Sequence, residues 1–130
     1  MKIGDAAARS GVSVKMIRYY ESIGLVSRAA RGANAYRDFD ERDVHDLRFI
    51  KRARSLGFPI GEIRALLALW RDRTRPSREV KRVVAAHIAA LEARIAEMQA
   101  MVATLAHLAD HCRGDDRPDC PILEDLAAGA

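Results

Sequence analysis

The chain has 130 residues, of which 5% are aromatic and 31% are charged. This length leaves room for one modest domain with an appendage, and the low aromatic share argues against a deep enzyme core. No apolar run approaches the roughly 20 residues of a membrane span, and the first residues lack the apolar segment of a signal peptide, so we expect a cytoplasmic protein without a membrane partner.

The two halves of the chain carry opposite charge. Residues 1–75 hold 16 Lys and Arg against 9 Asp and Glu, whereas residues 76–130 hold 6 against 9. A basic head suggests a polyanionic partner such as nucleic acid. Charge alone is equally compatible with a solvated surface, so the pattern of elements must distinguish the two.

Two short helical stretches separated by a turn open the chain. Residues 4–10 favour a helix, Gly11 suits the turn, and Ser13 is a typical N-cap of a second helix that runs to about Ile23. A short helix, a turn with glycine and a second helix predict a helix-turn-helix. Three residues of the second helix can face a core: Met16, Ile17 and Tyr20.

The middle of the chain predicts a small wing and two further helices. Gly24 is expected to end the second helix. Residues 28–39 contain Asn34, which tolerates the positive φ of a tight turn, and they predict a β-hairpin. Asp40 should cap a helix that runs to about residue 55, and residues 60–70 predict another helix after a Gly-Phe-Pro break.

A long helix follows, because residues 77–111 contain neither Gly nor Pro. Apolar residues recur there at alternating spacings of 4 and 3, the pattern of a coiled-coil seam. The seam comprises Val84, Ile88, Leu91, Ile95, Met98, Val102 and Leu105. Such a helix would be roughly 50 Å long, too long for the small head to bury its seam. A second copy of the chain is the expected partner, and a helix folded back on its own domain is the alternative.

The final segment holds the only two cysteines. Cys112 and Cys120 flank a loop rich in Gly and Asp, and Pro121 stands where the first residue of a short helix belongs. In a cytosolic chain such a pair is more often a metal or redox site than a structural disulfide.

These motifs together resemble the MerR family of bacterial regulators. The likeness lies in Ile17-Arg18-Tyr19-Tyr20-Glu21 through Leu25, in Asn34-Ala35-Tyr36-Arg37 and in Ala53-Arg54-Ser55-Leu56-Gly57-Phe58. Trp70, Ser77, Val80-Lys81 and the loop from Cys112 to Cys120-Pro121-Ile122 are similar to its copper-efflux regulator branch, CueR. The resemblance covers essentially the whole chain.

The resemblance implies a mainly α fold in three parts. A winged helix-turn-helix head that binds DNA would span residues 1–75. A dimerisation helix, pairing as an antiparallel coiled coil, would span residues 76–111, and a metal-binding loop with a short helix would span residues 112–130. The implied function is a transcriptional activator that senses metal and binds double-stranded promoter DNA as a homodimer. It would distort this DNA for RNA polymerase on the same promoter and so switch copper-efflux or detoxification genes.

The resemblance also assigns DNA contacts. The recognition helix would contribute Ser13, Lys15, Arg18 and Tyr20, and the wing would contribute Tyr36 and Arg37, with Arg31 and Arg54 on phosphates. Either Tyr19 or Tyr20 is expected to belong to the core instead.

The metal site is predicted at Cys112 and Cys120. Two soft thiolates without an obvious third ligand suit a soft monovalent ion, with Cu(I) first and Ag(I) or Au(I) as alternatives. A zinc site that adds His107 and His111 is the main rival, and a disulfide is a further one. We expect both histidines to lie outside the seam and to face solvent.

Residues near the start of the long helix should tune the site from the partner subunit. By resemblance, Ser77 stands where divalent-sensing relatives carry a third cysteine, although a serine after Pro76 is also an ordinary helix N-cap. Two thiolates with Cu(I) leave a negative charge, which Lys81 and the positive end of the short helix at Pro121 would offset.

Other functions find less support. The sequence has no nucleophile–His–acid set and no phosphate-binding Gly loop, so no enzyme is predicted. A cytosolic copper buffer or chaperone would explain the cysteines but not the basic head, and an iron–sulfur sensor would need four cysteines.

Overall fold

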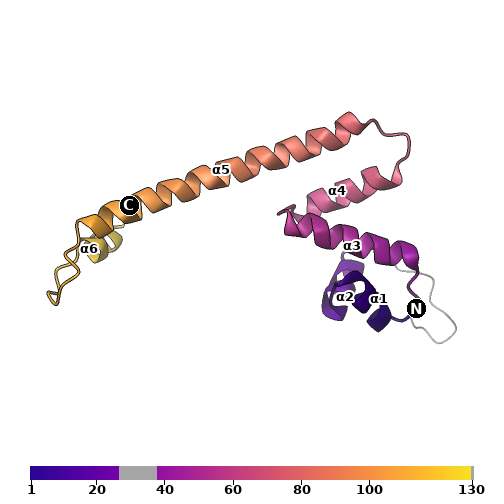
Figure 1. Ribbon diagram of the computed structural model, residues 1–130, viewed down its shortest axis with the longest axis horizontal. Coiled ribbons are helices and arrows are strands. Elements are labelled where there is room, and N and C mark those ends of the chain that lie inside the picture. The colour runs from indigo at the N-terminus through magenta and orange to yellow at the C-terminus, as the bar shows by residue number, and fades with distance from the viewer. Residues whose placement is uncertain (27–37, 130) are drawn as a thin grey trace. The chain divides into compact units, whose positions relative to one another are not determined.

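The computed structural model describes residues 1–26 and 38–129, and within these ranges the chain is helical and contains no strand. Six helices follow one another in Figure 1: α1 (Ile3–Ser10), α2 (Val14–Ser22), α3 (Glu41–Ser55), α4 (Ile60–Arg71), α5 (Ser77–Asp110) and α6 (Pro121–Ala128). They confirm the predicted mainly α architecture. Most of the hairpin predicted for residues 28–39 lies outside the described residues.

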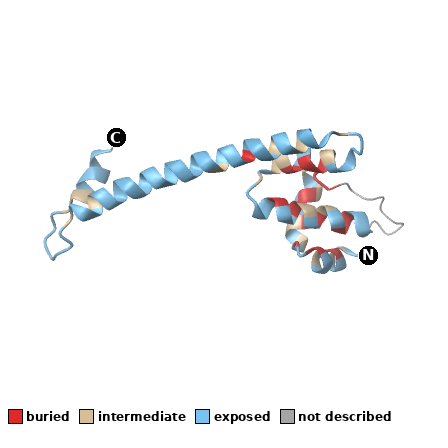
Figure 2. Cartoon of the chain, turned by 45° about the horizontal axis from the view of Figure 1, so that its top comes forward, coloured by how far each residue is buried: buried red, intermediate tan, exposed pale blue. Residues whose placement is uncertain are grey.

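The chain forms two compact units, Met1–Val83 and Val84–Ala130. The buried apolar side chains belong to the first unit, where α1 packs on α2 and α3, and α3 packs on α4 (Figure 2). The largest fully buried side chains are Phe39, Ile17, Leu47, Ile50, Ile63, Leu67, Val26 and Val44. The predicted boundaries at residues 75 and 111 remain predictions.

Local backbone chemistry sets the helix-turn-helix. Gly11 ends α1 with φ of 76°, and Gly24 follows α2 with φ of 72°, conformations that L side chains rarely adopt. Ser13 is the N-cap of α2, and its hydroxyl oxygen accepts a hydrogen bond of 3.2 Å from the backbone N–H of Met16. The predicted helix, turn and helix are therefore present at the predicted residues.

A capping box begins α3. The backbone N–H of Asp43 donates to the Asp40 carboxylate at 3.0 Å, and the N–H of Asp40 donates back to the Asp43 carboxylate at 3.0 Å. The N–H of Asp43 also holds the pKa of Asp40 below its ordinary value. The start of α3, directly after the segment predicted as a wing, is thus well defined.

Two arginines anchor the helix-turn-helix to the helices behind it. Arg48 on α3 donates to the Arg9 carbonyl at 2.8 and 3.1 Å, where α1 ends. Arg64 on α4 donates to the carbonyls of Ile23 and Gly24 at 2.7 and 3.1 Å, where α2 ends. Carbonyl groups at and just beyond a helix end have no partner within the helix, so each arginine satisfies groups of this kind.

Helix α5 has 34 residues and supplies most of the second unit. Six of the seven predicted seam residues are exposed in the single chain, from 37% at Val84 to 65% at Val102. Ser77 is the first helical residue and not the N-cap, because the N–H of Glu79 donates to the Pro76 carbonyl. No helix among the described residues is long and apolar enough to cross a membrane.

Candidate metal centre and nucleic-acid interface

Helix α2 presents its basic residues to solvent. Lys15 and Arg18 are both exposed, and Ser13 is exposed at the helix N-cap. The opposite side of α2 is held in the core by Ile17 and Tyr20, which are 0% and 3% exposed. The helix therefore has one buried side and one polar, cationic side, as a helix that enters a DNA groove requires.

Tyr20 belongs to the core, so the structure does not support the direct DNA contact predicted for it. Tyr19, its neighbour, is 47% exposed. The Tyr20 hydroxyl accepts a hydrogen bond of 2.8 Å from Nη1 of Arg54 on α3, and this bond raises the pKa of Arg54. Tyr20 thus bonds the Arg54 side chain, and the expectation that one of the two tyrosines belongs to the core is confirmed.

Three of the predicted DNA contacts lie outside the described residues. These are Arg31, Tyr36 and Arg37, all in the segment predicted as a wing. Arg54 lies in the described part and is exposed, apart from its bond to Tyr20.

The two cysteines meet where the long helix ends and the short one begins. Cys112 follows α5, and its N–H donates to the Ala109 carbonyl at 3.1 Å, whereas Cys120 is the N-cap residue of α6. Their sulfur atoms lie 3.8 Å apart, and both residues are half-buried, free thiols. A disulfide needs about 2.05 Å between sulfurs, so the pair is not bonded. One ion with metal–sulfur bonds of about 2.3 Å can contact both atoms.

The start of α6 favours a negative charge on Cys120. The pKa of Cys120 is lowered, chiefly by the backbone N–H of Leu123, with further contributions from the N–H of Ile122 and the Cys112 thiol. Pro121 at the first helical position has no N–H, so the N–H groups of the next two residues are the backbone groups that lower this pKa. This direction of the pKa shift is the one that the predicted positive end of the helix would produce.

The rival zinc site is not assembled. Among the described residues no three His, Cys, Asp or Glu side chains gather in a way that could hold a metal ion. His107 and His111 are exposed, as predicted, and they contact each other across one helical turn with ring centroids 4.2 Å apart. Ser77 and Lys81 are exposed in the first unit, and their action from a partner subunit remains a prediction.

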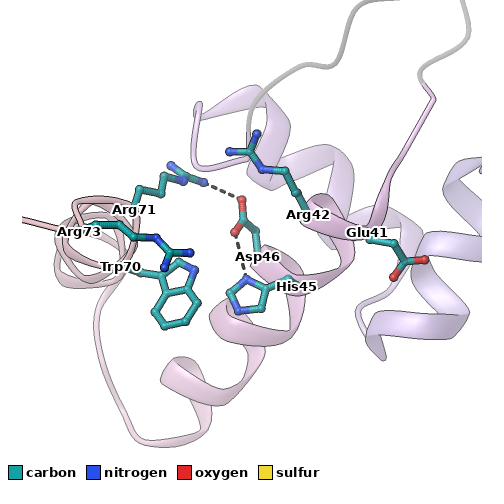
Figure 3. Close-up of a pocket in the computed structure, with 7 residues that line it drawn as sticks. All are labelled: Glu41, Arg42, His45, Asp46, Trp70, Arg71 and Arg73. Atoms are coloured by element: carbon teal, nitrogen blue, oxygen red, sulfur yellow. Dashed lines mark hydrogen bonds and ion pairs between the residues drawn. The ribbon is translucent and has the colours of Figure 1, made fainter.

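A further feature joins α3 to the end of α4 and was missed by sequence analysis. The His45 ring stacks on Trp70, with ring centroids 5.0 Å apart and ring planes at 22°. Figure 3 shows the two side chains among the residues that line a pocket. Asp46 beside it bonds Nη2 of Arg71 at 2.6 Å and lies 3.4 Å from Nδ1 of His45. Arg42, Arg73 and Glu41 complete the lining of a cavity of about 480 Å³. Sequence analysis noted Trp70 as part of the family resemblance, but no local sequence pattern indicates that it contacts His45.

Comparisons with known proteins agree with this arrangement. The family model described as MerR HTH family regulatory protein matches residues 1–70, and the one described as MerR, DNA binding matches residues 44–108. The chain is 59% identical to heavy metal-dependent transcription regulator 2 of Rhizobium meliloti (strain 1021), over 100% of this chain and 88% of that protein. It is 38% identical to the transcriptional regulator CueR of Salmonella typhimurium, over 98% and 92%.

A solved structure is similar throughout. The transcription regulator PbrR691 from Ralstonia metallidurans, determined in complex with lead(II), superimposes with a TM-score of 0.87 at 33% identity, over 97% of this chain and 98% of that one. The family models together reach from residue 1 to residue 108. The chain therefore belongs to the MerR family of helix-turn-helix proteins, whose members are transcription regulators and, as predicted, not enzymes.

Proposed function

We propose that the chain is a cytoplasmic, homodimeric transcriptional activator that senses Cu(I), and also Ag(I) or Au(I), through Cys112 and Cys120. It binds double-stranded promoter DNA with its helix-turn-helix head and switches copper-efflux or detoxification promoters by distorting the DNA. Its relatives named for heavy metals and for CueR support metal sensing. The observation that best supports this function is the pair of thiols, whose sulfur atoms lie 3.8 Å apart at the start of α6.

The donor set supports a soft monovalent ion. Two thiols meet in the loop, and no third His, Cys, Asp or Glu joins them among the described residues. Thiolate ligands favour Cu(I) over the hard cations, and structural zinc usually takes four ligands. The lowered pKa of Cys120 makes its thiol easier to deprotonate, as binding of a metal requires.

Charge balance supports the same assignment. A monovalent ion held by the thiolates of Cys112 and Cys120 would leave one net negative charge at the site. The backbone N–H groups of Leu123 and Ile122, which lower the pKa of Cys120, favour a negative charge on its sulfur. Lys81 of a partner subunit would add a full positive charge, and Ser77 at the head of α5 supplies no third thiolate.

Dimerisation is supported by the unpartnered seam of α5. Ile88, Ile95, Met98, Val102 and Leu105 are 49% to 65% exposed, and they repeat with the coiled-coil spacing. A continuous apolar seam of this kind is rarely left open on a monomer. A second copy that pairs antiparallel would cover it and place two recognition helices on one operator.

X-ray absorption at the metal edge during a titration of the reduced protein tests the metal assignment. We expect one Cu(I) per chain with sulfur as its only protein ligand. A first shell that contains nitrogen, or a preference for Zn(II), would contradict the proposal.

Transcription in vitro tests the mechanism. From the family resemblance we expect the target promoter to have a spacer that is longer than RNA polymerase prefers. Each extra base pair rotates the two promoter elements by roughly 34°. A dimer that bends and untwists the spacer can realign them. A promoter shortened by two base pairs should therefore be active without the protein and gain nothing from Cu(I). If Cu(I) activated the shortened promoter as strongly as the original one, the protein would act by recruiting RNA polymerase instead.

A further inference from the structure

His107 and His111 form a pair that the dithiolate site does not use. His107 lies in the last turn of α5 and His111 directly follows the helix, and their ring centroids are 4.2 Å apart. Both are exposed, and both stand outside the apolar seam. A partner helix on the seam would therefore leave the pair open to solvent.

The hydrogen bonding of His111 prepares it as a ligand. Its Nδ1 lies 2.8 Å from the backbone carbonyl oxygen of His107. A carbonyl oxygen only accepts, so Nδ1 carries the proton and donates it. In the neutral ring the lone pair is then on Nε2, away from the helix backbone. Histidines that ligate metals commonly donate their other N–H to a backbone carbonyl in this way.

From this geometry we propose a second metal site at His107 and His111, which takes a borderline divalent cation such as Ni(II), Zn(II) or Cu(II). Two imidazoles four residues apart on one helix face can contact a single ion through bonds of about 2.0–2.1 Å. Imidazole nitrogen suits these ions, whereas the thiolates of Cys112 and Cys120 suit softer ones. The site does not depend on the dithiolate function proposed above.

The site lies where the metal loop begins. The N–H of His111 donates to the His107 carbonyl at 3.3 Å, and the N–H of Cys112 donates to the Ala109 carbonyl at 3.1 Å. An ion that bridges residues 107 and 111 would hold this last turn of α5 in its helical form. Solvent would complete its coordination, because no third protein ligand joins the pair among the described residues.

Titration with Ni(II) alone tests the proposal on the full, untagged chain. The protein carries Cys112→Ser and Cys120→Ser, so the thiols cannot contribute. We expect one Ni(II) per chain in competition with a chromogenic chelator. His107→Gln or His111→Gln in this background should weaken binding at least about tenfold. His45→Gln, which alters an exposed histidine far along the sequence, is the matched control and should leave Ni(II) affinity unchanged.

A rescue variant separates a chelating pair from a single exposed histidine. Ala103 is exposed on α5, four residues before His107. Ala103→His added to His111→Gln rebuilds a pair at the same spacing and should restore most of the affinity. Failure of this rescue, unchanged affinity in His107→Gln, or loss of Ni(II) binding on cysteine replacement would each overturn the proposal. Far-UV circular dichroism checks that all variants keep their helix content.

Discussion

The hydrogen bond between Tyr20 and Arg54 offers a test of how the DNA-binding head is organised. Tyr20→Phe removes only the hydroxyl, because the ring stays in the core, where the side chain is 3% exposed. Hydrogen bonds to charged groups contribute about 1.5–3 kcal/mol, but water can replace this partner of the exposed Arg54, so we expect a loss near 1 kcal/mol. The melting temperature should fall by a few degrees.

The same variant should affect operator binding differently from Arg54→Ala. If Arg54 contacts a phosphate and Tyr20 only positions it, Tyr20→Phe should weaken binding by about two- to fivefold with an unchanged salt dependence. Arg54→Ala should lower the log–log salt slope by about 0.9 for each lost contact, or about 1.8 for a dimer. Fluorescence anisotropy at several salt concentrations measures both. A reduced slope in folded Tyr20→Phe would mean that Arg54 loses its phosphate contact without the hydroxyl, and it would refute the reasoning.

Four other outcomes are expected. Cys112→Ser or Cys120→Ser should abolish metal-induced transcription but leave apo-protein binding to the operator nearly intact, and loss of gel shift by a folded mutant would make the cysteines structural. Ser77→Cys should improve Zn(II) or Hg(II) binding in competition assays, and an unchanged metal profile would place selectivity wholly in the loop. Arg37→Ala should weaken binding to all operators, whereas Lys15→Ala or Arg18→Ala should change discrimination between them, as parallel titrations on matched and mismatched operators would reveal. Asp40→Ala should cost about 1 kcal/mol in urea unfolding at neutral pH. The pKa of Asp40 is lower in the folded protein than its ordinary value. The Asp40 carboxylate therefore contributes its full stabilisation at pH values above the ordinary pKa, and the contribution disappears as pH falls through the lowered pKa. The unfolding free energies of the wild type and of Asp40→Ala should thus converge in acid.

The arginines that bond helix ends explain why the head can be rigid despite its small core. Arg48 and Arg64 connect α3 and α4 to the carbonyl ends of α1 and α2. Each bond joins residues about 40 positions apart in the chain, so together they fix the recognition helix on the helices behind it. A regulator that transmits a signal to bound DNA needs such a rigid link between its recognition helix and the rest of the head.

The sequence by itself determined the helices and their ends, because the signals are local. Ser13, Gly24, Asp40 and Pro121 stand at the predicted caps and ends, where a side-chain oxygen, a positive φ or a fixed φ acts within a few residues. The proximity of the two cysteines could also be predicted from the sequence, since a short loop between two helices brings its ends together.

Tertiary packing decided what no local pattern contains. Adjacent tyrosines look alike in sequence, yet Tyr20 is buried and bonded to Arg54 while Tyr19 is exposed, because only one side of α2 faces the core. The stack of His45 on Trp70 likewise joins residues 25 positions apart through the packing of α3 on α4. Such contacts depend on how the helices pack against one another. The free energy that favours one packing comes from burial of apolar side chains across the whole core. The periodicity of a single helix does not contain this information.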